Sequence, residues 1–262
     1  MTDVEVTVGP VAHGGHCVAR PPDGPVLFVR HALPGERVRV EVTERRAGFW
    51  RADAVEVLEA SPDRVPPPCP FAGPGRCGGC DFQHVSVPAQ RALKAAVVRE
   101  QLARLGGRPD VDVEVSGLEP ALGWRTRVQY AVDRDGRLGF HPFRSHDVVP
   151  VDRCLIAAPA AQAVLASRWS PALASVEVVA SGGGDVTVLT RRSRTGLARV
   201  VDGPSRVREV TGGREFVLDA AAFWQVHPAA PAVLTETVVG LLAPRAGERA
   251  FDLYAGAGLF AA

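Results

Sequence analysis

Three cysteines gather in a short segment that is rich in glycine and proline. Cys69, Cys77 and Cys80 follow a C-x7-C-x2-C spacing, and Cys154 lies in a distant segment. A C-x2-C pair places two sulfur atoms on the same side of a tight turn, and glycines let backbone N–H groups approach inorganic sulfide closely. With Cys154 as the fourth thiolate, these residues favour a 4Fe–4S cluster.

Two other interpretations of the same cysteines stay open. A structural zinc site usually pairs two C-x2–4-C knuckles or combines two cysteines with two histidines, whereas Cys154 stands by itself. Alternatively, the thiols bind nothing and belong to the protein core. The remaining cysteine, Cys17, is expected to behave as a small buried apolar residue.

A glycine loop near the end of the sequence could bind a nucleotide-like cofactor. Residues 251–258 read F-D-L-Y-A-G-A-G, an apolar run that ends in D-x3-G-x-G. Class I methyltransferases present this form to S-adenosylmethionine (SAM), because the glycines let the backbone approach the ligand and the next helix N-terminus faces its carboxylate. Ala261 also completes the G-x-G-x-x-A of a dinucleotide fold, so the loop by itself does not choose between them.

Aromatic side chains alternate with arginine and histidine in two further stretches, residues 124–130 and 140–146. Hairpins that face RNA stack bases on aromatic rings and hold phosphates with arginine, although alternating strands in any sheet give similar patterns. Residues 61–215 carry 21 Lys and Arg against 16 Asp and Glu, a modest bias that suits phosphate contacts. The side chains expected to contact RNA are Arg125, Arg127, Phe140, Arg144 and His146.

The elements that must position these residues follow from the hydrophobic pattern. Short alternating stretches separated by turn residues predict a small closed β-barrel, since closure removes exposed strand edges. The predicted barrel strands are residues 4–8, 17–20, 26–29, 37–43 and 50–58. Residues 61–68 are a proline-rich linker, and helices are expected at 88–105 and 228–242. The other predicted strands are a hairpin of 127–132 with 138–143, a hairpin of 176–180 with 186–190, and a buried strand at 250–254.

Taken together, the cysteine run, the F-W-Q-V-H-P stretch at residues 223–228 and the glycine loop resemble the RNA (uracil-5-)methyltransferase family, in its iron–sulfur branch that acts on ribosomal RNA. The resemblance implies an N-terminal TRAM barrel, whose turn matches A-L-P-G-E at residues 32–36, and a cluster held by the four cysteines. It also implies SAM contacts at Gln225, Asp252, Tyr254, Gly256 and Gly258. His227 stands where the family usually has Asn, and the gap between the first two cysteines is longer than usual.

The family's chemistry is covalent. A thiolate adds to C6 of a uracil that has left its stack, C5 takes the methyl group of SAM, and a base removes the C5 proton before the thiolate leaves. The resemblance places the nucleophile and the base after Ala262, so we expect a truncated chain that holds no catalytic residue and is inactive alone. The alternative is a non-enzymatic RNA-binding iron–sulfur module; zinc-dependent binding of another partner is a third possibility.

The expected fold is multidomain α+β. Its parts are an OB-like TRAM barrel at 1–60, a linker and cysteine cluster at 61–90, a central antiparallel RNA-binding domain at 91–215, and the start of a Rossmann-like SAM domain at 216–262. Neither a signal peptide nor a long apolar run is present, so we expect a cytoplasmic protein without membrane contact. The expected partner is ribosomal RNA, and no obligate protein partner is inferred.

Overall fold

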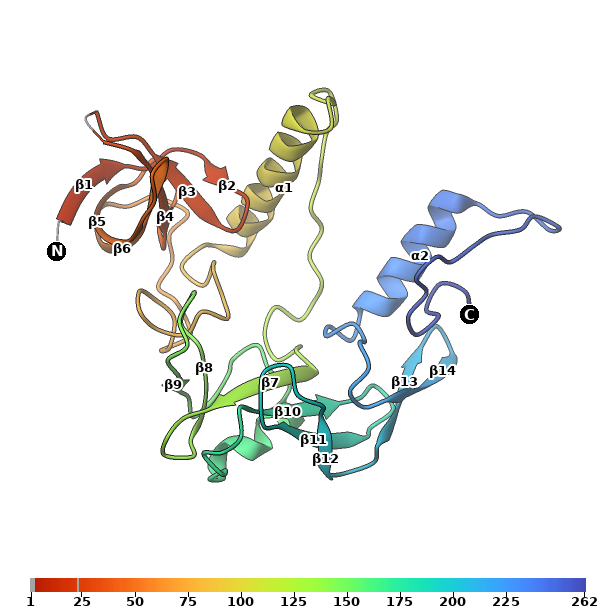
Figure 1. Cartoon of the computed structure of the whole chain (residues 1–262). Helices are drawn as coiled ribbons and strands as arrows, with labels where there is room; N and C mark the ends of the chain where they lie inside the picture. Colours follow the sequence, from red (N-terminus) through yellow and green to blue (C-terminus); the bar gives the residue numbers. More distant parts are fainter. Residues whose placement is uncertain (1–2, 23) are drawn as a thin grey trace. The chain divides into compact units, whose positions relative to one another are not determined.

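The computed structural model describes residues 3–22 and 24–262, which form two compact units (Figure 1). The first unit comprises residues 1–117 with 141–145, and the second comprises residues 118–140 with 146–262. In these described ranges no helix is both long and apolar enough to cross a lipid bilayer. The predicted barrel and cysteine run thus fall in the first unit, and the predicted hairpins and glycine loop in the second.

A six-stranded sheet forms the core of the first unit, in the order β1-β5-β6-β4-β3-β2. Its strands are β1 (Asp3–Thr7), β2 (Val11–Ala12), β3 (His16–Ala19), β4 (Val26–Arg30), β5 (Arg37–Arg45) and β6 (Phe49–Glu59). β4 and β6 run parallel, and the other neighbours are antiparallel. All five predicted barrel strands are confirmed, and β2 is additional.

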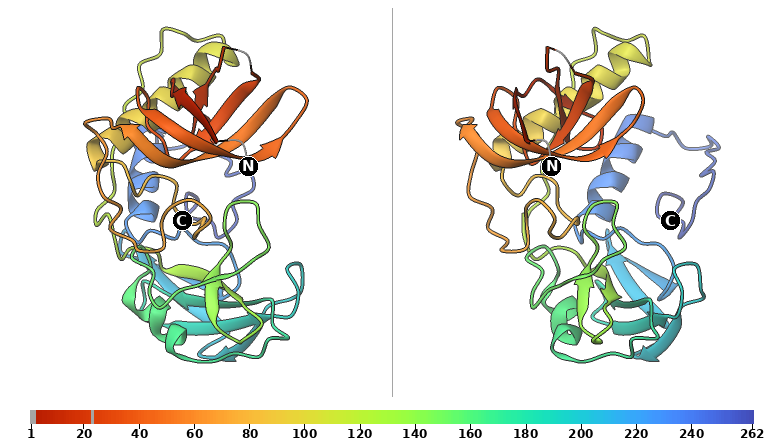
Figure 2. Two further views of the ribbon diagram at one scale, coloured as in Figure 1. Left: turned by 90° about the vertical axis from the view of Figure 1, so that its left-hand side faces the viewer. Right: turned by 60° about the vertical axis from the view of Figure 1, so that its left-hand side comes forward.

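The sheet closes into a barrel because its two edge strands, β1 and β2, follow one another directly along the chain. Only residues 8–10 separate β1 from β2; Gly9 N–H donates to the Val18 carbonyl at 2.7 Å, and Val18 N–H donates to the Pro10 carbonyl at 2.9 Å. The same run therefore pairs with β5 at its start and with β3 at its end, as the curled sheet in Figure 2 illustrates. Alternate valines such as Val38 and Val40 on β5 are fully buried inside.

A buried carboxylate holds the turn before β5. Gly35 has a φ of +86°, a conformation that glycine adopts without strain. The fully buried Glu36 accepts N–H bonds from Leu33 at 2.8 Å and Ser61 at 3.1 Å. Arg64 completes the set, with Nε 2.5 Å from Oε1. Burial by itself would raise the pKa of Glu36, but the bonds from Arg64 and the two amides outweigh it and hold that pKa below its ordinary value.

Helix α1 (Val87–Arg104) packs against the barrel within the first unit (Figures 1 and 2). Proline in its first turn is tolerated because the N–H there has no helical partner. Leu93, Ala96 and Val97 lie three and four residues apart, so they share one face, and all three pack on the barrel core. The helix predicted at 88–105 is confirmed to within one residue at each end.

The second unit contains a six-stranded antiparallel sheet in the order β12-β11-β10-β7-β8-β9. Its elements are β7 (Arg127–Val132), β8 (Leu138–Phe140), β9 (Val149–Pro150), the 3-10 helix η1 (Pro159–Ala166), β10 (Ser175–Ala180), β11 (Val186–Arg191), β12 (Arg199–Asp202), and the separate ribbon of β13 (Arg206–Thr211) and β14 (Arg214–Asp219). Tyr130 of β7 donates its hydroxyl proton to the Ala161 carbonyl of η1 at 2.9 Å. Both predicted hairpins are confirmed, whereas β12, β13 and β14 were not predicted.

Helix α2 (Ala230–Leu242) follows the ribbon and confirms the helix predicted at 228–242. Beyond it, residues 250–262 contain turns and no strand. Phe251 is 84% exposed and Leu253 is 76% exposed, so the buried strand predicted at 250–254 is wrong. A strand of a parallel sheet is stable only when neighbouring strands and helices cover it, and no described residues do so here.

Candidate functional site

The three clustered cysteines lie in the loop between β6 and α1, and each is partly exposed. Within this loop Cys77 N–H donates to the Phe71 carbonyl at 3.0 Å, and Gly79 N–H donates to the Cys77 sulfur at 3.5 Å. Gly78 lies so close to the chain at residues 141–143 that a Cβ on it would be 2.7 Å from the Phe143 nitrogen. The absence of a side chain at Gly78 therefore lets two backbone segments lie close together, and the turn brings the Gly79 N–H to the Cys77 sulfur.

The cysteine thiols are, by their chemistry, suitable donors for a cluster. Among the described residues, no three His, Cys, Asp or Glu side chains lie close enough together to hold a metal ion. Cys154 belongs to the second unit, where its N–H donates to Gln162 Oε1 at 2.9 Å and its side chain packs on the core. Burial, and then the nearby Cys154 thiol, raise the pKa of Tyr130.

Cys17 lies apart from these cysteines, in the barrel core. It is 1% exposed, and its thiol donates to the Ala32 carbonyl at 3.4 Å. Burial, followed by the charge of Glu36, raises the pKa of the Cys17 thiol to about 12. The expected small buried residue is confirmed, and its thiol stays protonated at neutral pH.

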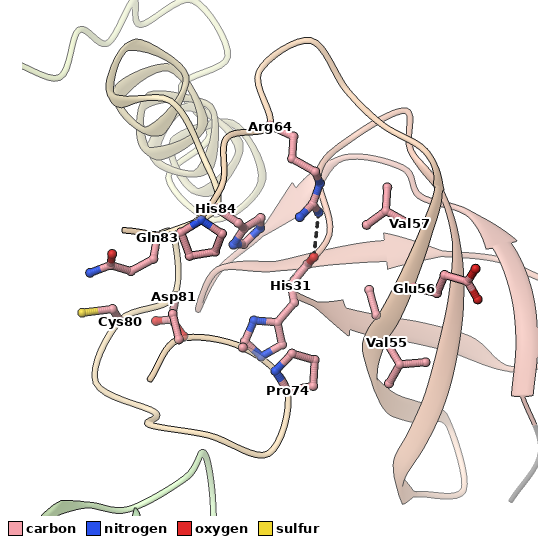
Figure 3. Close-up of a pocket in the computed structure, with 14 residues that line it drawn as sticks. His31, Val55, Glu56, Val57, Arg64, Pro74, Cys80, Asp81, Gln83 and His84 are labelled. Carbon is pink, nitrogen blue, oxygen red and sulfur yellow. Dashed lines mark hydrogen bonds between the residues drawn. The ribbon is translucent and has the colours of Figure 1, made fainter. Parts of the chain in front are cut away.

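A pocket of about 190 Å³ lies beside the cysteine loop in the first unit, lined by residues that include His31, Arg64, Cys80 and His84 (Figure 3). Burial and the charge of Arg30 lower the pKa of His31 to about 3. Burial and the charge of Arg64 lower the pKa of His84 to about 4, so both imidazoles are neutral at pH 7. The His84 Nε2 atom is buried and has no hydrogen-bond partner among the described residues.

Arginine and aromatic side chains stack beside this loop. The Arg30 guanidinium carbon lies 4.0 Å from the centre of the Phe143 ring, and the His16 ring centre lies 5.5 Å from it. Phe143 is still 37% exposed. Arg144, a predicted RNA contact, has its Nη1 2.8 Å from Glu44 and a side chain that is 51% exposed. Partly exposed aromatic and arginine side chains of this kind can stack on a base and contact a phosphate.

The second unit holds the other four predicted RNA contacts, and they differ in accessibility. His146 is exposed. Phe140 is half-buried, with its ring centre 5.2 Å from that of Tyr130. Arg125 is also half-buried, and its Nε donates to the Arg127 carbonyl at 3.2 Å. His146 is therefore accessible to RNA, whereas Phe140 and Arg125 are only partly accessible because each already contacts another part of the second unit.

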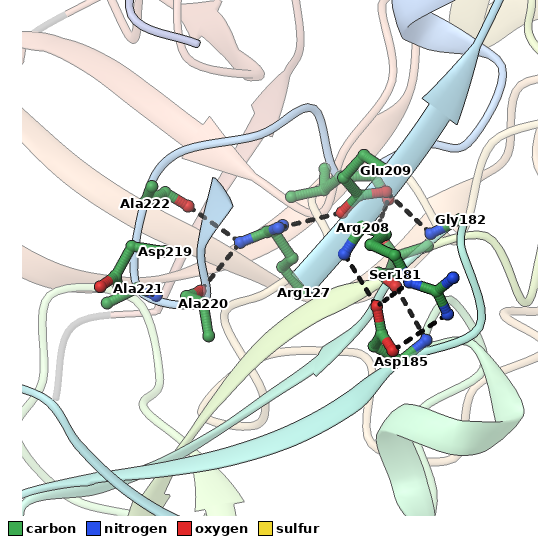
Figure 4. Close-up of polar contacts among 12 residues, drawn as sticks. Arg127, Ser181, Gly182, Asp185, Arg208, Glu209, Asp219, Ala220, Ala221 and Ala222 are labelled. Carbon is green, nitrogen blue, oxygen red and sulfur yellow. Dashed lines mark hydrogen bonds and ion pairs between the residues drawn. The ribbon is translucent and has the colours of Figure 1, made fainter. Parts of the chain in front are cut away.

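Burial contradicts the RNA contact predicted for Arg127, whose side chain is 7% exposed. Its Nη2 lies 2.9 Å from the Glu209 carboxylate, and its Nη1 donates to the carbonyls of Ala220 at 3.1 Å and Ala222 at 2.8 Å (Figure 4). The sequence of β7 shows which of its side chains share a face of the sheet, but it does not show which face is covered by another element. Arg127 therefore binds protein groups and is not available to phosphate.

The segment that carries Gln225 runs from β14 to α2 without regular structure. Trp224 is buried, and His227 stacks on Trp124 with ring centres 5.4 Å apart and an interplanar angle of 29°. His227 Nδ1 accepts the Ala229 N–H at 3.2 Å, the same bond that an Asn side chain makes in an Asx turn. Histidine can thus replace the usual Asn, and Gln225 lies half-buried between two anchored neighbours.

The glycine loop has the expected backbone but lacks the expected strand before it. Gly256 and Gly258 have φ values of +57° and +76°, in the left-handed region that glycine adopts readily. Tyr254 is fully exposed, and Asp252 is partly buried with Oδ2 lacking a hydrogen-bond partner among the described residues. The loop residues that were predicted to contact SAM thus lie in a turn and not at the end of a sheet strand.

Glu209 is a residue that sequence reasoning missed. On β13, Val207 and Glu209 are buried whereas Arg206 and Arg208 are exposed. A glutamate on the buried face of an alternating strand needs a cation nearby, because an unpaired buried charge is costly. The R-V-R-E-V alternation could have signalled this need, but it does not identify Arg127 as the partner.

Comparisons with known proteins agree with the barrel and with the family resemblance. The TRAM domain model matches residues 2–55. An uncharacterized RNA methyltransferase of Streptomyces avermitilis is 46% identical over 99% of this chain and 68% of that relative. A 23S rRNA (uracil(1939)-C(5))-methyltransferase of Halomonas elongata is 34% identical over 98% of this chain and 62% of that relative. The chain thus spans about two thirds of the length of these relatives.

A solved structure gives the same fold. The Pyrococcus abyssi tRNA (uracil-54, C5)-methyltransferase, in complex with S-adenosyl-L-homocysteine, matches 97% of this chain and 69% of its own with a TM-score of 0.70. At 20% identity this likeness shows the fold alone. The Streptomyces avermitilis relative is 46% identical over nearly the whole of this chain and over 68% of its own length, which shows that the chain belongs to the TRAM-containing RNA methyltransferase family.

Proposed function

We propose that this chain is the RNA-binding and SAM-positioning part of a SAM-dependent RNA (uracil-5-)methyltransferase that acts on ribosomal RNA. The observation that carries the proposal is the 34% identity with the Halomonas elongata 23S rRNA enzyme across 98% of this chain. Because the chain spans 62% of that relative, the activity of the whole enzyme is part of the proposal. SAM supplies the methyl group, and the residues of this chain bind and orient the two substrates.

RNA capture is the role that we propose for the exposed cationic and aromatic side chains. In the first unit, the partly exposed Arg144 and Phe143 side chains offer a phosphate contact and a stacking surface. In the second unit, the candidates are Arg125, Phe140 and His146. Arg127 is not among them, since its guanidinium is buried.

We propose that five residues contact SAM: Gln225, Asp252, Tyr254, Gly256 and Gly258. Gln225 is half-buried, and it lies between the buried Trp224 and His227, which stacks on Trp124. Backbone at glycine positions with positive φ can approach a ligand more closely than a residue with a Cβ allows. These residues would orient SAM.

A 4Fe–4S cluster is proposed at Cys69, Cys77 and Cys80, with Cys154 as the fourth ligand. The support is the donor chemistry: thiols in a glycine loop with an N–H donated to the Cys77 sulfur, a contact typical of iron–sulfur sites. When bound, the cluster would cross-link its ligands without taking part in methyl transfer. Zinc at the same thiols is the competing occupant.

The rival function is a non-enzymatic RNA-binding module. One observation favours it: the residues after α2 form no strand, and Phe251, Leu253 and Tyr254 are exposed. Methyl transfer by a chimera of this chain with the rest of a relative distinguishes the two functions, because a chain that is only a binding module would support none.

Anaerobically purified protein should be brown and contain about four iron atoms per chain, because four thiolates complete a cubane. Cys69→Ser and Cys154→Ser should each lose the cluster, as measured by iron analysis and visible absorption. Cys17→Ala is the matched control and should keep its iron, since that thiol is buried in the barrel core. Stoichiometric zinc without visible absorption would contradict the cluster, and unchanged iron in Cys154→Ser would contradict the fourth ligand.

RNA affinity should fall as salt concentration rises, because phosphate contacts release counterions. Replacing Arg125 and Arg144 together with alanine should weaken binding and flatten the slope of log K against log salt by about one for each lost phosphate contact. Filter binding over a salt series measures this. Arg99→Ala together with Arg104→Ala, which removes the same number of charges from side chains that are 47% and 73% exposed on α1, is the matched control. A slope in the Arg125 and Arg144 variant equal to that of the control would place the RNA surface elsewhere.

Methyl transfer should require more than this chain, because its glycine loop and Tyr254 lie in solvent. We expect no labelled methyl from SAM on ribosomal RNA with the 262-residue chain alone. A chimera in which this chain replaces the matching 68% of the Streptomyces avermitilis relative should methylate C5 of uridine. Gln225→Ala in the chimera should raise the KM for SAM, whereas Gln101→Ala on α1 should not. Transfer by the chain alone, or none by the chimera, would contradict the proposal.

A further inference from the structure

The segment around Gln225 has no secondary structure of its own, so other parts of the second unit must fix its position. Two consecutive residues of the second unit do so. The Thr126 N–H and hydroxyl both donate to the Val226 carbonyl, at 2.9 and 3.0 Å. Arg127 Nη1 donates to the carbonyls of Ala220 and Ala222 at 3.1 and 2.8 Å. Carbonyls on both sides of Gln225 are therefore bonded to residues 126 and 127.

Glu209 fixes the guanidinium that makes these bonds. Its Oε1 lies 2.9 Å from Arg127 Nη2, and its Oε2 accepts the Gly182 N–H at 2.8 Å, so one carboxylate joins β13 to β7 and to the β10–β11 turn (Figure 4). The two side chains are 7% and 6% exposed. A planar guanidinium held by a carboxylate on one nitrogen must aim its other nitrogen in a fixed direction.

We propose that the buried Arg127–Glu209 pair is a positioning device that holds the Gln225 segment against the sheet in the orientation needed for SAM. The inference rests on the proposed function, in which Gln225 contacts SAM. Arg127 itself touches neither substrate. It acts through the carbonyls of Ala220 and Ala222, which precede Gln225 by five and three residues.

The contacts of Arg127 separate this role from simple stabilisation. A buried ion pair can often be replaced by apolar side chains without loss of stability. Apolar side chains at 127 and 209 would fill the same space but could not donate to the two carbonyls, so the segment would loosen while the unit stays folded. A double substitution, Arg127→Met with Glu209→Met, therefore tests positioning without leaving one unpaired buried charge.

Hydrogen–deuterium exchange of the 262-residue chain measures the loosening directly. Amides of residues 221–227 should exchange about tenfold faster in the double variant, whereas those of β10 and β11 should not change. Glu209→Gln should speed exchange at these amides by less than the double variant does, because its amide oxygen can still accept from Arg127 whereas its NH2 group cannot accept the Gly182 N–H. Arg208→Met, which breaks the exposed Arg208–Asp185 pair on the same strand, is the matched control and should resemble wild type. Unchanged exchange at residues 221–227 in the double variant would overturn the inference.

The same variants in the chimera measure the consequence for SAM. The double variant should raise the KM for SAM about tenfold and leave the KM for RNA unchanged, with Glu209→Gln between wild type and the double variant. An unchanged KM for SAM in an active chimera would overturn the positioning role. If the unsubstituted chimera transfers no methyl group, the proposed function fails, and the exchange measurement still decides whether Arg127 holds the segment.

Discussion

A buried guanidinium, that of Arg127, joins the main parts of the second unit. One terminal nitrogen pairs with Glu209 of the β13–β14 ribbon, and the other donates to the backbone at Ala220 and Ala222. A charge taken out of water must be paired and hydrogen-bonded, so the sheet, the ribbon and the segment leading to α2 cannot move apart without leaving it exposed or unpaired. The placement of Gln225 follows from that constraint.

The first unit also contains a buried charge that is paired and hydrogen-bonded, but there the buried group is negative. There a carboxylate, Glu36, is fully buried, and Arg64 and two backbone amides surround it. The turn before β5, the end of β6 and the approach to the cysteine loop are thereby fixed to one another. In each unit, an ion pair with a buried carboxylate thus attaches irregular segments to a regular sheet. The alternating buried valines hold the sheets together, but they do not fix these irregular segments.

Much of the fold could be predicted from local patterns, because strands and hairpins leave them. Alternating valines predict the barrel strands, and Asp-Gly predicts the turn between β7 and β8. The buried strand at 250–254 was not found, since burial of a parallel strand depends on neighbours that a local pattern does not contain. The RNA contact predicted for Arg127 was wrong for a related reason. The alternation of side chains along β7 shows which residues share a face with Arg127, but only the fold shows that Glu209 covers its guanidinium.

Double-substitution coupling between Arg127 and Glu209 tests the central interaction most directly. The free energies of unfolding of wild type, Arg127→Met, Glu209→Met and the double variant are measured by urea denaturation. Each single variant should lose about 3–5 kcal/mol, because it leaves one buried charge unpaired. The double variant should lose less than the sum by at least about 1 kcal/mol. Losses that add to within about 0.5 kcal/mol would show that the two side chains do not depend on each other, and would contradict the account.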